Sequence, residues 1–201
     1  MRQDIRDLRF KIYDFRLREQ LIRLDTPLIT QQVETLRAGD SVLLSGVVYT
    51  ARDAAHARLV ELLKRGEPLP IDLAGQVIYY VGPTPAKPGQ VIGSAGPTTS
   101  GRMDSFTPAL IEAGLKGMIG KGQRSRSVID AIVEHKAVYF AATGGTAALL
   151  AKRVVSCEVV AYEDLGCEAI HRLEVRDLPL LVINDCHGGD FYRENLARYA
   201  R

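Results

Sequence analysis

Short apolar runs alternate with segments of helical periodicity along most of this chain, and this alternation limits the possible folds more than any other feature. The expected strands are 41–48, 76–81, 91–93, 117–120, 137–142, 154–162, 172–175 and 180–184. The expected helices are 52–64, 106–113, 127–135, 146–153 and a tail from residue 190. Apolar strands that alternate with helices predict an α/β fold with a mostly parallel sheet covered by helices. The strand-rich C-terminal third predicts a second, more antiparallel layer.

The first 24 residues differ from the rest. They contain six arginines and no glycine or proline, with apolar residues interleaved among the charges. This pattern predicts a helix, or a strand followed by a helix, that packs on its own domain or on a partner chain. A membrane-surface helix is less well supported, because acids are mixed among the bases. We therefore expect an N-terminal arm at 1–24 and one domain at 25–201.

The charge balance excludes two classes of protein. The chain has 26 Lys plus Arg against 24 Asp plus Glu, a net charge of +2, which excludes a strongly basic nucleic-acid binder and an acidic disordered tail. No apolar run approaches the roughly 18 residues needed to span a bilayer. The charged start of the chain lacks the apolar segment of a signal peptide. We expect a cytoplasmic protein with no nucleic-acid or membrane partner.

The three cysteines, Cys157, Cys167 and Cys186, predict no metal site on this chain. An odd number argues against a disulfide framework. Their spacing contains no C-x-x-C pair and no iron–sulfur motif. They are interpreted as buried or surface thiols, with a ligand or redox role as the alternative.

Four junctions at the ends of expected strands carry unusual residues, at the edge where open α/β sheets bind ligands. At the first, Thr50 and Asp53 fit a capping pattern that places Arg52 in the first helical turn. A cation is unfavourable there unless an anion lies nearby, because the helix dipole repels it. That anion is either a local carboxylate or a bound ligand.

The second junction has Thr98, Thr99 and Ser100 between glycines, followed by Arg102. This arrangement is either a cradle for an oxyanion or a polar turn that caps a helix. At the third junction, Lys121 stands between two glycines. It either reaches a ligand or lies in a solvated turn.

The fourth junction, 143–146, is a strand–Gly-Gly–helix connection whose N–H groups suit a carboxylate or phosphate, although close packing explains the glycines equally well. No Walker A or G-x-G-x-x-G pattern is present, so nucleotide binding lacks its usual marks. Arg52, Arg102 and Lys121 together form a candidate clamp for a small dianion. The nearby Arg124 and Arg126 are interpreted as surface charge.

Several segments, in order along the chain, resemble the C-terminal domain, or separate β subunit, of the class I iron–sulfur fumarate hydratases. The matching segments are LLSGVVYTARDAAH (43–56), YYVGPTPAKPGQVIGSAGPTTSGRMD (79–104), GMIGKG (117–122), YFAATGGTAALLAKRV (139–154) and VAYEDLGCEAIHRLEVRDLPLLVINDCHGGDFY (160–192). The resemblance covers about residues 25–192. It implies a swivelling β/β/α three-layer domain with a mostly parallel sheet and a second, smaller sheet.

The resemblance also implies a partner and a reaction. A larger α subunit would hold a [4Fe-4S] cluster through its own three cysteines, in a heterotetramer or other oligomer. The reaction would be the reversible hydration of fumarate to L-malate, a step of the tricarboxylic acid cycle. The related L-tartrate dehydratase and methylfumarate hydratase reactions remain alternatives. A non-catalytic module that binds an anionic metabolite is the alternative from another class.

The resemblance assigns roles to five residues. Thr98 matches the threonine thought to act in proton abstraction. Thr99 and Arg102 match substrate-binding positions, Arg52 matches the arginine of the ARD motif, and Lys121 matches the lysine of the GKG segment. The chain departs from the usual family pattern at 144–147 and 185–191, and neither departure touches these five residues.

Overall fold

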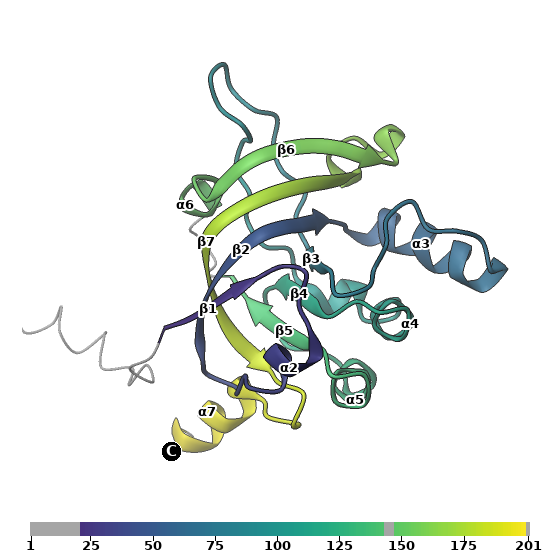
Figure 1. The fold of residues 1–201 in the computed structure, drawn as a ribbon. Coiled ribbons are helices and arrows are strands. Elements are labelled where there is room, and N and C mark those ends of the chain that lie inside the picture. The colour runs from purple at the N-terminus through teal and green to yellow at the C-terminus, as the bar shows by residue number, and fades with distance from the viewer. Residues whose placement is uncertain (1–20, 143–146, 200–201) are drawn as a thin grey trace, which may run out of the picture.

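The computed structural model describes residues 21–142 and 147–199, and within these ranges all strands belong to one seven-stranded sheet (Figure 1). The strands are β1 (Ile22–Asp25), β2 (Ser41–Thr50), β3 (Val77–Tyr79), β4 (Gly117–Gly120), β5 (Val138–Ala141), β6 (Val154–Ala161) and β7 (Ile170–Asn184). The helices are α2 (Thr30–Val33), α3 (Asp53–Arg65), α4 (Thr107–Glu112), α5 (Arg126–Glu134), α6 (Ala147–Ala151) and α7 (Phe191–Tyr199), with short 3-10 helices η1 (Ser100–Met103) and η2 (Glu163–Glu168). The predicted α/β fold is confirmed.

The sheet closes on itself. Strands β2, β3, β4 and β5 pair in parallel in that order, and β7 pairs antiparallel with both β5 and β2. These five strands therefore form a ring. β1 pairs in parallel with the first half of β2. β6 pairs with the first half of β7, on the edge that pairs with β5 near the end of the strand. Helices α3, α4 and α5 lie side by side against the parallel strands (Figure 1).

The central strands bury both faces, which explains their continuous apolar sequences. Along β3, Val77 and Tyr79 belong to a hydrophobic cluster that also contains Phe140 of β5. The residue between them, Ile78, belongs to a second cluster that contains Leu110 of α4. Alternate side chains thus fill the ring and the layer beneath the helices.

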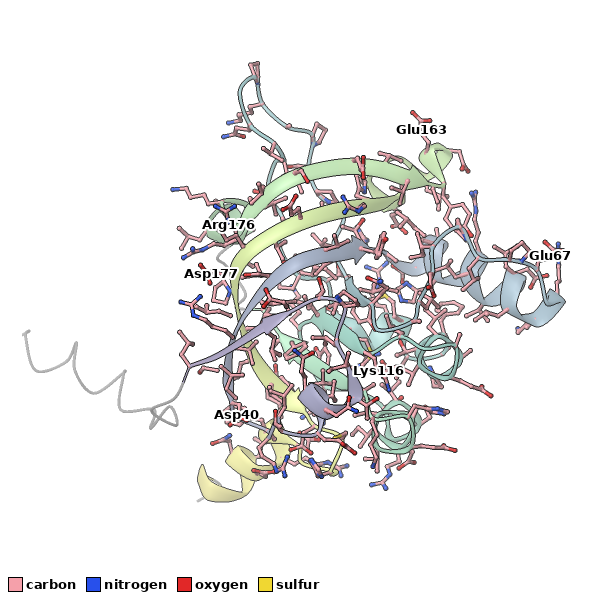
Figure 2. All side chains as sticks on the ribbon, in the orientation of Figure 1. Asp40, Glu67, Lys116, Glu163, Arg176 and Asp177 are labelled. Atoms are coloured by element: carbon pink, nitrogen blue, oxygen red, sulfur yellow. The ribbon has the colours of Figure 1, made fainter. Side chains whose placement is uncertain are left out.

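The strands predicted at 172–175 and 180–184 are parts of one strand, β7. It bends at Arg176 and Asp177, which Figure 2 labels on the curve of the ribbon. The facing register shifts near Gly46 of β2, whose φ is +101°. Because β7 pairs with β2, β5 and β6, the expected antiparallel layer is continuous with the parallel sheet and does not form a separate smaller sheet.

The prediction of a strand at 91–93 is wrong. These residues lie in the proline-rich loop between β3 and η1, and they pair with no strand of the sheet. Hydrogen bonds across the loop hold this segment in place of a strand ladder. Thr84 N donates to Ser94 O at 3.1 Å, and Gly93 N donates to Thr84 O at 3.1 Å. Within this folded-back loop Ile92 is buried, whereas Val91 is exposed.

Residues 1–20 of the expected arm lie outside the described residues. Its last residues contribute to β1, Ile22–Asp25, which pairs with β2 in parallel. The division into an arm at 1–24 and a domain at 25–201 stays a prediction. Among the helices of the described ranges, none combines the length and apolar character that a membrane-crossing segment needs.

Candidate functional site

The loops that carry the predicted site residues meet beyond the carboxyl ends of β2, β3 and β4. Thr98 N donates to Tyr80 O at 2.7 Å, just past β3, and Lys121 N donates to Thr98 O at 3.2 Å, just past β4. A parallel bridge joins Thr99 to Lys121. Backbone hydrogen bonds therefore bring Thr98, Thr99 and Lys121 together, as the strand-end rule predicts.

This close approach depends on Gly120. A Cβ at this position would overlap Ser100 Oγ and lie 2.9 Å from Tyr80 Cδ2. The Ser100 hydroxyl is buried and lies 2.8 Å from the Tyr139 hydroxyl, which donates to Gly122 O at 2.9 Å. The first glycine beside Lys121 thus lets the threonine segment pack against β4.

Arg102 lies against the first turn of α3. Its Nε donates to Asp53 Oδ1 at 3.0 Å, and its Nη2 lies 2.8 Å from Asp53 Oδ2, which makes a two-point ion pair. The Arg102 side chain is 50% exposed, so part of its guanidinium faces solvent. A ligand can therefore reach Arg102 without displacing Asp53.

Arg52 is the N-cap residue of α3, and the predicted capping pattern is wrong. Thr50 ends β2, and its buried hydroxyl donates to Ala169 O at 3.2 Å, so it caps no helix. Arg52 Nη2 lies 3.3 Å from Glu168 Oε1 of η2. A protein carboxylate therefore does pair with Arg52, but it comes from a segment distant in the sequence and not from the local sequence.

The two ion pairs lie at the same end of α3. Arg52 is the N-cap of this helix and pairs with Glu168 of η2, and Arg102 pairs with Asp53, the first residue of the helix. Lys121 is exposed and forms no ion pair within the described part of the chain. Thr98 is half-buried, and its hydroxyl makes no hydrogen bond to another described residue. The arrangement offers cationic groups and a hydroxyl to a small anion.

The interpretation of Arg124 as surface charge is wrong. Its side chain is fully buried, and its Nε donates to Asp104 Oδ1 at 2.8 Å. Its other nitrogens donate to the hydroxyls of Tyr80 and Thr107, at 3.2 and 2.8 Å. It also lies over the ring of Tyr139, 4.9 Å from the centroid. Arg124 therefore joins the loop that carries Thr98 to the loop that carries Lys121.

Arg126, by contrast, is surface charge as predicted. Its side chain is 74% exposed, and its Nη2 lies 2.8 Å from Asp130 Oδ1, one turn along α5. Sequence pattern did not separate the two arginines, because the partners of Arg124 come from distant segments.

His56 is a buried histidine beside the site. It is fully buried in the first turns of α3, with Nδ1 2.9 Å from Arg52 O and its ring 5.3 Å from that of Tyr80. Burial lowers the pKa of His56 to about 4. The imidazole is therefore neutral at neutral pH and packs as an uncharged group.

The described residues contain no group of three or more histidine, cysteine or acidic side chains that could hold a metal ion. Cys157 lies in β6, Cys167 in η2 and Cys186 in the core after β7. Cavities of about 420 and 440 Å³ flank the loop 82–94, and Arg52, Thr98, Arg102 and Lys121 line neither of them. The junction predicted at 143–146 lies outside the described residues.

Comparison with known proteins finds a matching family model and relatives whose sequences are similar to most of this chain. A family model described as the fumarase C-terminus matches residues 4–195. Fumarate hydratase 2 of Leishmania major is 40% identical over 173 residues, which cover 84% of this chain and 30% of the relative. The aerobic class I fumarate hydratase of Escherichia coli K12 is 40% identical over 168 residues, which cover 83% of this chain and 31% of the relative.

A third relative is only slightly longer than the region that it shares with this chain. The putative L(+)-tartrate dehydratase subunit beta of Methanocaldococcus jannaschii is 40% identical over 173 residues, which cover 83% of this chain and 89% of the relative. The chain therefore spans about a third of the length of these fumarate hydratases but nearly all of the named subunit.

Proposed function

Since the chain belongs to the fumarase C-terminus family, we propose that it is the β subunit of a two-subunit hydro-lyase that interconverts fumarate and L-malate. The name of one relative supports the assignment as a separate subunit. The match covers 30% of a fumarate hydratase but 89% of a relative named subunit beta. A larger α subunit would then supply the remaining part of the enzyme.

The observation that carries the proposal is the meeting of three strand ends. Asp53 ties Arg102 to the end of α3 that Arg52 begins, and backbone hydrogen bonds tie Thr98 to Lys121. A dicarboxylate needs two cationic contacts a few ångströms apart. In the proposal, Arg52, Arg102 and Lys121 bind its carboxylates, and Thr99 adds a hydrogen bond.

The proposed chemistry places growing charge beside these cations. Dehydration of L-malate removes a C–H proton next to one carboxylate while the hydroxyl leaves the adjacent carbon, giving fumarate and water. Negative charge builds on that carboxylate as the C–H bond breaks. Arg102 and Lys121 then stabilise the transition state more than the bound ground state, which is the condition for faster turnover.

Thr98 takes the proton in this proposal. An alcohol has a pKa near that of water, about 15.7, so the hydroxyl needs help to act as a base. Lys121, whose backbone N–H donates to Thr98 O, supplies positive charge that favours the alkoxide. A carboxylate relay from the α subunit would serve the same end, and the alternative role of Thr98 is a hydrogen-bond donor that positions the substrate.

The proposed enzyme assigns its [4Fe-4S] cluster to the α subunit. The described residues of this chain do not fit a cluster, because none of their histidine, cysteine and acidic side chains form a group of three. Cys186 is buried, whereas Cys167 is exposed on another segment. No step of the reaction assigned to this chain passes through the cluster.

The test is reconstitution. We expect the chain, co-expressed with the product of a neighbouring gene that encodes a three-cysteine α subunit and purified without oxygen, to turn over L-malate. The isolated chain is expected to be inactive. Robust activity of the isolated chain would overturn the assignment as a subunit.

L-Tartrate dehydration is the second candidate function, because the relative of matching length carries that name. The same cations would bind a diacid with one more hydroxyl group, and methylfumarate hydration is a third reaction of this class. Turnover of L-malate, L-tartrate and methylfumarate side by side decides among them. Binding of a dicarboxylate without turnover of any of the three would favour a non-catalytic binding module.

A further inference from the structure

One carboxylate, Glu168, contacts both the Arg52 side chain and the backbone of α3. It is the last residue of η2, far from Arg52 in sequence. Glu168 Oε1 lies 3.3 Å from Arg52 Nη2, and Glu168 Oε2 accepts a hydrogen bond from Ala54 N at 3.2 Å. Each oxygen of the carboxylate therefore has a separate partner at the start of the helix.

The start of α3 is an unfavourable place for the positive charge of Arg52 unless a negative charge lies nearby. The first N–H groups of a helix have no partner within the helix, and the helix dipole makes this end positive. Arg52 adds a full positive charge at the N-cap, where it makes no side-chain capping bond. Glu168 satisfies one of the helix N–H groups and balances the charge of Arg52. The side chains of Arg52 and Glu168 are only 20% and 24% exposed, so solvent screens the pair weakly.

The guanidinium is also confined by Gly82. A Cβ at Gly82 would lie 2.8 Å from Arg52 Nη1 and 3.3 Å from Arg52 Cδ. One amino group of Arg52 thus lies against bare backbone, and the other is paired with Glu168. These two contacts, on different nitrogens, restrict the position and the rotation of the planar group.

We propose that Glu168 is a positioning residue that holds the Arg52 guanidinium in the orientation that binds one carboxylate of the dicarboxylate ligand. The inference rests on the proposed function and adds a residue to its machinery. Glu168 acts through Arg52 and does not itself contact the ligand.

Asp164 provides a matched control on the same segment. It also belongs to η2 and also pairs with α3, where Arg58 Nη1 donates to Asp164 Oδ1 at 2.8 Å. The side chains of Arg58 and Asp164 are 42% and 62% exposed. If Glu168 served only to hold η2 against α3, removing the charge of Glu168 or that of Asp164 would change kcat/KM to the same extent.

The experiment is a double-mutant cycle in the co-purified two-subunit complex. Glu168→Gln keeps the size of the side chain and an oxygen that accepts from Ala54 N, but it removes the charge that holds Arg52. We expect it to lower kcat/KM by about tenfold or more, and by less than about twofold when Arg52→Ala is already present. Asp164→Asn is expected to change kcat/KM by less than about twofold in either background.

A second readout does not depend on turnover. The NMR signals of the Arg52 guanidinium, assigned by their loss in Arg52→Ala, are expected to be sharp in the wild-type chain and in Asp164→Asn, and to broaden in Glu168→Gln. Unchanged signals in Glu168→Gln would overturn the inference, as would an effect on kcat/KM that persists in full without Arg52. If either result is obtained with an active complex, the proposed function still stands. A wild-type complex that is inactive on all three diacids would refute both the function and the inference.

Discussion

Replacement of Arg102 by alanine separates a catalytic role from a structural one. In the chain alone, the Arg102 and Asp53 side chains are 50% and 31% exposed, and such a pair stabilises a fold by only about 0–1 kcal/mol. In the proposed site between two subunits, the loss of a charged contact to the ligand would cost about 2–5 kcal/mol. Because about 1.36 kcal/mol corresponds to a tenfold change in rate, a cost near 2.7 kcal/mol lowers kcat/KM about 100-fold.

The assay compares kcat/KM of the Arg102→Ala complex with that of wild type, and urea unfolding of both chains. We expect a loss of at least about 100-fold in kcat/KM, with a free energy of unfolding within about 1 kcal/mol of wild type. Arg126→Ala is the control, because that side chain is 74% exposed and its ion pair among the described residues lies within α5. Turnover of Arg102→Ala within a few fold of wild type would remove Arg102 from the site.

Three further predictions concern the residues that build the site. His56 has a pKa near 6.5 in the unfolded chain and of about 4 in the folded chain, so the free energy of unfolding should fall between pH 6.5 and 4, by roughly 3 kcal/mol at most. Urea unfolding at both pH values should show a smaller loss in His56→Gln than in wild type. An equal loss in the two proteins would exclude His56 as the cause. Arg124→Ala leaves a carboxylate without its buried partner and should cost about 3–5 kcal/mol of stability, against less than about 0.5 kcal/mol for Arg126→Ala. Gly120→Ala places a methyl group in overlap with the Ser100 hydroxyl and should lower the melting temperature by several degrees, whereas Gly101→Ala, with its nearest contact at 3.9 Å, should not; similar melting temperatures would contradict the packing described.

Local pattern was enough to predict most of the fold. The expected strand 117–120 coincides with β4, and the expected helix 127–135 differs from α5 by one residue at each end. These elements have strong periodicity or continuous apolar runs and are buried on the sides that the pattern indicates. The errors fall where local pattern and tertiary pairing differ. β7 contains Asp177 and Pro179, which read as a break, yet pairing with three other strands keeps the strand continuous.

The site was predictable only in part, for a related reason. The strand-end rule placed Thr98, Thr99 and Lys121 together without knowledge of their contacts. The partners of the charged groups had no such signal. Glu168 reaches Arg52 from a distant 3-10 helix, and no spacing in the sequence links the two residues.

The same limit applies to the buried arginine of the site. Arg124 follows a glycine-containing loop and has the sequence context of an exposed residue, but each of its three side-chain nitrogens donates a hydrogen bond, to Asp104, Tyr80 or Thr107. Only the three-dimensional structure brings these acceptors together. Buried charges are therefore the part of such a site that sequence pattern predicts least well.

The central claim is that the loops containing Arg52, Thr98, Arg102 and Lys121 form the cationic half of a dicarboxylate site shared with a second subunit. A crystal structure of the two-subunit complex with a bound dicarboxylate tests it most directly. We expect ligand carboxylate oxygens within about 2.7–3.2 Å of the Arg52 and Arg102 guanidinium groups, at the interface between the subunits. A ligand bound elsewhere, with both guanidinium groups contacting only Glu168 and Asp53, would contradict the claim.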